Sequence, residues 1–113
     1  MSHQTIRFLL ESCSDNMEIR FLSPVYLVGS YQTRPDEAKD IDIVMIMTDD
    51  RMRRLFGEVA FNERRFEFMR KQKLWYELYI KDFDIDFKVQ SIRDASFHTG
   101  PKTKLGKYVT VPE

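Results

Sequence analysis

The sequence has little cysteine, no net charge and no long apolar run, and each shortage argues against a class of protein. Cys13 is the single cysteine and cannot form a disulfide within the chain, which indicates a reducing compartment. Lys plus Arg and Asp plus Glu each number 18, so the charge balance argues against a general nucleic-acid coat or a membrane-surface binder. No apolar stretch approaches the roughly 20 residues that span a bilayer.

Targeting and repeat signals are also missing. The N-terminus has no charged start followed by an apolar run and a small-residue cleavage site, which predicts no signal peptide. No internal repeat or low-complexity segment occurs. Together with the single cysteine, these absences predict a soluble cytoplasmic protein.

The chain length and composition suit one small domain spanning residues 1–113. Nine Phe, five Tyr and one Trp are many for this length, and such large side chains fill a small core with few residues. Residues from about 91 to 113 carry Gly, Pro and several Lys, and we expect them to form a flexible or late-docking tail.

The hydrophobic pattern predicts helices and strands in alternation. Residues 3–12 have apolar side chains at helical spacing, and residues 25–29 read as a short strand that stops at a glycine. Residues 30–39 are polar and broken by a proline, which predicts a loop with one helical turn near its start. Residues 40–47 are the clearest strand, and Thr48 or Asp49 is suited to cap a following helix.

The second half of the chain is more ambiguous. In residues 63–73, Phe66 and Phe68 alternate with charges, which favours a strand and a turn, although a continued helix is the alternative. Residues 74–80 and 82–90 both look like strands, and the Lys81-Asp82 turn between them predicts a hairpin. The whole pattern predicts an α+β fold with a mixed β-sheet of four or five strands and helices packed on one face.

Carboxylates interrupt two of the predicted strands. Asp40 and Asp42 lie two residues apart, so they share one face of a strand at a separation of about 6 to 7 Å. Asp84 and Asp86 repeat this alternation in the later strand. Carboxylates, water and substrate phosphate are the oxygen ligands that Mg²⁺ prefers, so the pattern indicates a metal site, with a solvated strand face as the alternative.

Charge is uneven along the chain although it balances overall. Residues 36–50 are acidic, with six carboxylates against Lys39 alone, whereas residues 51–73 hold eight basic residues against three glutamates. An acidic pole beside a basic belt suits metal binding and the attraction of an anionic substrate. A solvated helix face followed by a turn is the alternative interpretation.

A strand that ends in Gly29-Ser30 and is followed by the aspartates resembles a known signature. "YLVGS", nine residues and then "DIDI" are similar to the motif of the nucleotidyltransferase superfamily that includes DNA polymerase beta. The likeness is closest to its small single-domain members, the minimal nucleotidyltransferases. It covers residues 25–47 firmly and 82–89 loosely, and it implies a nucleotidyltransferase-like fold.

The resemblance implies metal ligands and a chemistry. Asp40, Asp42 and Asp86 would be the catalytic carboxylates that hold two Mg²⁺ ions, and Asp84 is the alternative third ligand. "IDFKV" matches the last strand of the family better than the residues around Asp84 do. The implied reaction is Mg²⁺-dependent transfer of a nucleoside monophosphate from an NTP such as ATP to a hydroxyl acceptor.

The resemblance also implies that Gly29 and Ser30 hold the triphosphate. Arg34, Lys39 and Lys88 are candidates for further phosphate contacts, with plain surface charges as the alternative. The pair Arg34-Pro35 departs from the family, because many members have a regular helix there. This departure puts the contribution of a helix dipole to phosphate binding in doubt.

The acceptor and the partner stay open at this stage. A protein hydroxyl and a nucleic-acid hydroxyl are both compatible with the pattern, as is each of the NTPs. Minimal nucleotidyltransferases that pair with a HEPN-type toxin imply a partner protein, and a homo-oligomer is the other way to complete an acceptor site. A nucleotide-binding regulatory or antitoxin-like module that acts mainly through its partner is the alternative function, and a plain metal-binding domain is a third.

Overall fold

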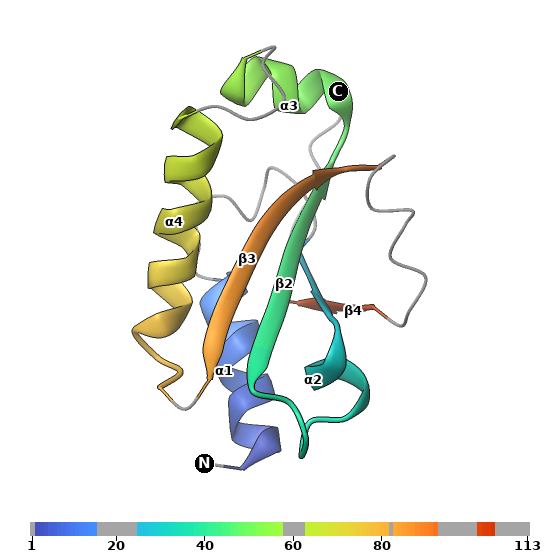
Figure 1. The fold of residues 1–113 in the computed structure, drawn as a ribbon, viewed down its shortest axis with the longest axis vertical. Helices are drawn as coiled ribbons and strands as arrows, with labels where there is room; N and C mark the ends of the chain where they lie inside the picture. Colours follow the sequence, from blue (N-terminus) through green and yellow to red (C-terminus); the bar gives the residue numbers. More distant parts are fainter. Residues whose placement is uncertain (1, 16–24, 58–62, 82, 93–101, 106–113) are drawn as a thin grey trace.

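Four strands form one mixed sheet in the computed structural model, and helices pack against it (Figure 1). The strand order is β3 (Asp84–Ser91), β2 (Asp40–Met47), β1 (Val25–Val28) and β4 (Thr103–Leu105). β2 and β3 are parallel, whereas β1 is antiparallel to both β2 and β4. The structure describes residues 2–15, 25–57, 63–81, 83–92 and 102–105. The predicted α+β class and mixed sheet are confirmed.

The apolar alternation of β2 and β3 fixes which face of the sheet is buried. Ile41 and Ile43 on β2 are paired with Ile85 and Phe87 on β3, and all four side chains are buried. Residues directly paired on neighbouring strands point to the same side of the sheet, so these four form a continuous apolar surface. The aspartates of both strands therefore lie on the opposite face.

Helices α1 (His3–Asp15) and α4 (Glu63–Glu77) contribute to the core on this apolar face. Leu10 of α1 and Tyr76 of α4 are fully buried in the same cluster as Phe87, against which Tyr76 stacks. Burying one large apolar side chain contributes roughly 1.5–3 kcal/mol. Figure 1 shows α4 running alongside β3, the outer strand of the sheet.

Two shorter helices follow strand ends. α2 (Ser30–Thr33) comes directly after β1, and α3 (Asp49–Phe56) comes directly after β2. The Thr48 hydroxyl accepts a hydrogen bond of 3.2 Å from the Arg51 backbone N–H, which confirms the predicted N-cap of α3. The apolar spacing of the sequence also predicts Val59 and Ala60 as part of this helix, and both lie outside the described residues.

The predicted strand and hairpin in the second half of the chain are wrong. Residues 63–77 form the single helix α4, and β3 pairs with β2 rather than with a neighbour in a hairpin. The segment is made of good helix formers without Gly or Pro, and this propensity outweighs the alternation of Phe66 and Phe68.

The two ends of the chain also differ in detail from the expectations. The first helix runs to Asp15, three residues past the expected end. Part of the expected tail, Thr103–Leu105, is paired with β1 as an outer strand, and residues 93–101 and 106–113 lie outside the described residues. Among the helices described, none is long and apolar enough to cross a membrane.

Candidate functional site

The four aspartates of β2 and β3 form two cross-strand pairs. Asp40 is paired with Asp84, and Asp42 with Asp86, in the parallel register. Asp42 and Asp86 are partly buried, whereas Asp40 and Asp84 are exposed at the start of their strands. The sheet therefore brings together all four predicted carboxylates on one face, and Asp86 lies level with Asp42. The assignment of Asp86 rather than Asp84 as third ligand stays a prediction.

Gly29 lies against Asp42. β1 ends at Val28, whose partner on β2 is Asp42, and Gly29 follows with φ 78° and ψ −163°. Glycine is essentially the only residue that adopts this backbone region. A Cβ at Gly29 would lie 2.3 Å from Asp42 Oδ2, so a side chain there would displace the carboxylate. The predicted Gly-Ser turn and the predicted aspartates are thus adjacent in space.

The turn after Gly29 is held in place by a buried tyrosine. α2 begins at Ser30 but has only four residues, and the Arg34 N–H bonds to the Ser30 carbonyl at 2.6 Å as the helix ends. The single helical turn expected near Ser30 is confirmed, and the regular helix typical of the resembled family does not form before Pro35. Tyr31 is fully buried and contacts Phe83 edge to face, which anchors the turn.

His3 ties the turn to α1, a role that no pattern in the sequence indicates. Its Nε2 lies 2.7 Å from Asp36 Oδ1, and its Nδ1 lies 3.2 Å from the Tyr31 hydroxyl. A neutral imidazole that donates from Nε2 to the carboxylate accepts from the tyrosine hydroxyl at Nδ1. The two contacts join residues far apart in sequence, and no spacing rule predicts such pairs.

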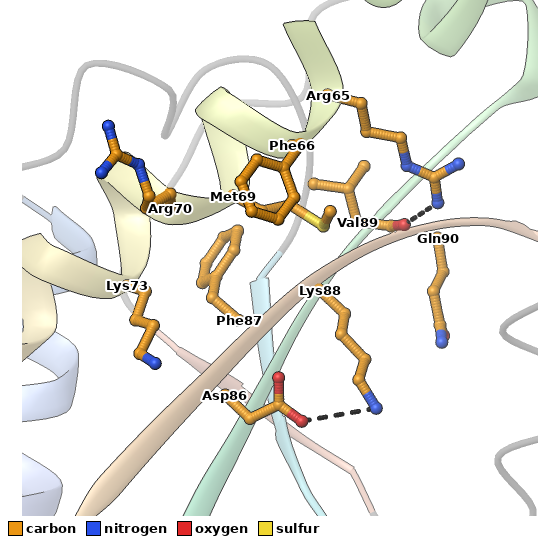
Figure 2. A pocket seen from close by; sticks show the side chains of 10 residues that line it. All are labelled: Arg65, Phe66, Met69, Arg70, Lys73, Asp86, Phe87, Lys88, Val89 and Gln90. Atoms are coloured by element: carbon orange, nitrogen blue, oxygen red, sulfur yellow. Dashed lines mark hydrogen bonds and ion pairs between the residues drawn. The ribbon is translucent and has the colours of Figure 1, made fainter. Parts of the chain in front are cut away.

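A small cavity of about 110 Å³ lies at this point of the sheet. Its lining includes Gly29, Asp42 and Asp86, together with Lys88 and apolar residues of β1 and β2. The ammonium of Lys88 lies 3.4 Å from Asp86 Oδ2 (Figure 2). Lys88 follows Asp86 by two residues and so shares its face of the strand. The cavity is therefore lined by two carboxylates, by one ammonium group and by the backbone of Gly29, which no side chain covers.

Carboxylate oxygens are suitable ligands for a hard cation, but these aspartates do not form a complete metal site as they stand. Among the residues that the structure describes, no group of three or more His, Cys, Asp or Glu is arranged to hold a metal ion. The register aligns Asp42 with Asp86, and Lys88 is paired with Asp86. Metal binding by Asp86 would need Lys88 to leave this carboxylate.

Two other predicted phosphate contacts lie at the edge of the site. Arg34 is exposed and forms an ion pair of 3.7 Å with Glu37. The Lys39 carbonyl accepts a 3.3 Å hydrogen bond from the Asp84 backbone N–H, which joins the starts of β2 and β3. Neither side chain lines the small cavity, and their contact with phosphate stays a prediction.

A second and larger cavity of about 640 Å³ begins at Asp86 and runs between β3 and α4 (Figure 2). Asp86 and Lys88 line both cavities. This cavity was not predictable from the sequence, because the local pattern of residues 63–73 favours a strand rather than the helix that forms one of its walls. The basic belt of residues 51–73 was the one signal that pointed to this part of the molecule.

Comparisons with protein-family models, curated proteins and solved structures found no match for this chain. The likeness to nucleotidyltransferases therefore depends on the residues and the geometry described above.

Proposed function

We propose that this protein is a Mg²⁺-dependent nucleotidyltransferase that moves a nucleoside monophosphate from an NTP to a hydroxyl acceptor. One observation carries the proposal. The Gly29-Ser30 turn lies directly against Asp42, and Asp42 is paired with Asp86, so the motif residues from three separate segments meet at one place. Chance acidic residues on a solvated strand face would not require a glycine beside them.

Each of these residues has a defined role in the proposal. Gly29 lets backbone approach the phosphates closely, and Ser30 offers a hydroxyl and a backbone N–H to their oxygens. Asp40, Asp42 and Asp86 would hold two Mg²⁺ ions, with Asp84 as the alternative to Asp86. When bound, Mg²⁺ would polarise the α-phosphate and neutralise the leaving pyrophosphate.

The protein itself mainly positions the reactants. β2 and β3 fix the aspartates through the parallel ladder and the buried side chains on the other face. Tyr31, buried between α1 and the sheet, fixes the turn that would hold the triphosphate. Holding the reactants in a reactive geometry is worth several kcal/mol of activation free energy in such reactions.

The ion pair between Lys88 and Asp86 favours a second candidate function. A regulatory or antitoxin-like module would keep the nucleotide pocket and use Lys88 as a fixed countercharge to one carboxylate. Such a module would bind an NTP without transferring it, and would act mainly through a partner protein. Nucleotide binding without any transfer, in the presence of candidate acceptors, is the outcome that separates it from an enzyme.

The test uses the purified chain, each α-³²P-labelled NTP and Mg²⁺, with the product of a neighbouring gene and with cellular RNA as candidate acceptors. We expect label on a protein or on nucleic acid, and Asp42→Asn to abolish it, because loss of one ligand removes several kcal/mol of transition-state stabilisation. Asp50→Asn is the matched control, since Asp50 lies on the exposed part of α3 and pairs with Arg53.

Metal-dependent binding gives a second readout that does not need the acceptor. Mn²⁺ plus the correct NTP should raise the melting temperature of the wild-type chain by mass action. At an NTP concentration of about ten times the Kd, the free energy of unfolding should rise by about 1.4 kcal/mol. Near wild-type transfer by Asp42→Asn would overturn the metal site. A melting curve unchanged by Mn²⁺ with all four NTPs, together with no transfer, would overturn the nucleotide site itself.

A further inference from the structure

The larger cavity is a groove between helix α4 and the outer strand β3. Figure 2 shows Phe66 and Met69 of α4 facing Phe87 and Val89 of β3 across it. Phe66 lies at the rim with half of its surface exposed. The lining also holds charged and polar side chains, namely Arg65, Arg70, Lys73, Asp86, Lys88 and Gln90. The groove is thus apolar along its floor and charged along its sides.

One wall of the groove is the outer edge of β3. β3 is the first strand in the order β3-β2-β1-β4, and β2 is its single partner among the strands that the structure describes. The Arg65 guanidinium donates a hydrogen bond to the Val89 carbonyl, so this carbonyl points away from β2 and into the groove. Backbone groups of alternate residues point the same way, which places those of Phe87 on the same edge.

The charge in the groove is predominantly positive. Four cationic side chains line it against the single carboxylate of Asp86. Arg70 and Lys73 also pair with Glu67 and Glu77 on the helix surface, at 3.2 and 3.6 Å. Exposed pairs of this kind contribute little, so they leave much of the positive charge of the groove available to an anionic partner.

We propose that this groove binds an extended, acidic segment of a partner protein, which adds to the edge of β3 as a further strand. Alternate side chains of an added strand point to opposite faces. One set, apolar, would lie against Phe66, Met69 and Phe87. The other set, acidic, would face Lys88 directly and would be attracted at longer range by the cations of α4. The main chain of the segment would pair with the outward-facing groups of β3 and would replace the Arg65 guanidinium at the Val89 carbonyl. Adding a strand beside a helix in this way is a common mode of binding an extended peptide.

The charge decides between this partner and a second copy of the chain. Two copies joined edge to edge through β3 would bring the cations of both grooves together, and like charges placed across an interface cost affinity. The phosphates of a nucleic acid would pair with the cations, but a nucleic acid has no peptide backbone to form inter-strand hydrogen bonds with the edge of β3. An acidic peptide with alternating apolar residues would cover the apolar floor, attract the cations and form backbone hydrogen bonds with the strand edge.

The probe is a fluorescein-labelled peptide that alternates Glu with Val and matches the eight residues of β3 in length. We expect saturable binding to the wild-type chain by fluorescence anisotropy, without nucleotide or metal. A peptide with Lys in place of Glu should bind at least tenfold more weakly because it meets the cations of the groove. Methylation of alternate backbone nitrogens should also weaken binding tenfold or more, because it removes the ladder hydrogen bonds.

Two neighbouring positions on α4 give a matched pair of protein variants. Arg70→Glu reverses a charge that lines the groove, and we expect it to weaken binding about three- to tenfold. Lys71→Glu makes the same change at an exposed position that does not line the groove, and it should change binding by less than about twofold. Asp42→Asn should bind the peptide as the wild-type chain does, which separates this proposal from the proposed transfer activity.

Several results would overturn the proposal. Equal affinities of the Glu and Lys peptides would show that charge does not select the partner. An unchanged affinity after N-methylation would show that the peptide does not add to β3 as a strand. Tighter binding of a labelled oligouridylate than of the acidic peptide would assign the groove to nucleic acid instead. Dimerisation of the chain in sedimentation velocity that the peptide reverses would assign the β3 edge to a second copy.

Discussion

Gly29 shows how one residue can couple two parts of a site. Its backbone angles belong to a region that other residues enter only at a cost, and its missing side chain leaves room for the Asp42 carboxylate. The turn and the strand therefore constrain each other at this point. Any larger residue would move either the turn that bears Ser30 or the carboxylate of Asp42.

Gly29→Ala should destabilise the protein by about 1–3 kcal/mol, because alanine is strained at this φ and its Cβ meets Asp42. Urea unfolding measures this loss. Gly57→Ala is the matched control, since Gly57 also has a positive φ, of 95°. Both variants should lose stability, but only Gly29→Ala should also lose the rise in melting temperature caused by Mn²⁺ plus NTP. Equal nucleotide responses in the two variants would contradict the role of Gly29 in the site.

Lys88 gives a second prediction at the level of single residues. Its ammonium competes with a metal ion for Asp86, so Lys88→Gln should tighten the binding of Mn²⁺ alone by up to about fivefold, the range of an exposed ion pair. Calorimetric titration of Mn²⁺ without nucleotide measures this change. Lys71→Gln, on the exposed part of α4, is the control and should leave Mn²⁺ binding unchanged. Weaker binding of Mn²⁺ by Lys88→Gln would show that Asp86 is not a metal ligand.

Among the elements, α1 and α4 are joined by hydrogen bonds as well as by apolar packing. Ser14 donates to the Leu10 carbonyl at 2.8 Å, and since a hydroxyl has one proton, the Tyr76 hydroxyl donates to Ser14 at 2.7 Å. Trp75 Nε1 donates to the Cys13 carbonyl at 3.0 Å. These contacts hold the end of α1 against the end of α4, and so fix the helix that forms one wall of the groove.

Tyr76→Phe should reduce the free energy of unfolding by about 1 kcal/mol, because the buried hydrogen bond to Ser14 is lost while Ser14 keeps its bond to Leu10. Chemical denaturation measures the change. Tyr79→Phe is the control, since Tyr79 is largely exposed and its ring contact with Trp75 is retained; it should cost less than about 0.5 kcal/mol. Equal losses in the two variants would mean that the Ser14 contact does not stabilise the pair of helices.

α4 also explains why the sequence predicted a strand where a helix forms. Phe68 and Met69 pack against the core, whereas Phe66 and Leu74 are about half exposed. Apolar residues thus lie on more than one side of the helix, and the usual single stripe that signals a helix is blurred. The local alternation of Phe66 and Phe68 then looked like a strand. One of these apolar residues, Phe66, lines the groove between α4 and β3.

For the whole molecule, the ordinary features of the fold were predictable and the non-local contacts were not. The strand character of β2, the cap at Thr48 and the four aspartates follow from period and residue type. The parallel pairing of Asp42 with Asp86, and the contact of His3 with Asp36, depend on the topology of the chain. A single sequence contains no local signal for either contact. The sequence therefore identified the candidate carboxylates but could not predict which of them pair across the sheet.

Stability should fall at alkaline pH because buried groups, Cys13 and Tyr76 among them, resist ionisation. Burial raises the pKa of the Cys13 thiol from 9.0 to about 11 and raises the pKa of Tyr76 above its ordinary value of 10.0. A group with a raised pKa in the folded state contributes its full stability below the unfolded pKa and loses it as the pH rises toward the folded pKa. The free energy of unfolding should therefore decrease from about pH 9 upward, by at most about 1.4 kcal/mol per pH unit for each group.

Urea unfolding between pH 8 and about pH 11 measures this decrease, with Cys13→Ala as the comparison. The variant loses the thiol, so its slope between pH 9 and about pH 11 should be shallower than that of the wild-type chain, whatever the substitution does to stability at neutral pH. Identical slopes for the two chains would show that the Cys13 thiol ionises as easily in the folded protein as in the unfolded one.

The parallel pairing of β2 and β3 has a consequence for how the protein folds. Asp42 and Asp86 come from strands separated in sequence by two helices, and a long stretch of chain must be closed before those strands can pair. Pairings of this kind form slowly, because the chain between the two strands loses conformational entropy before their contacts can form. Binding of metal and nucleotide at the proposed site during refolding would therefore report formation of the β2–β3 ladder, because no folding intermediate that lacks this ladder pairs Asp42 with Asp86.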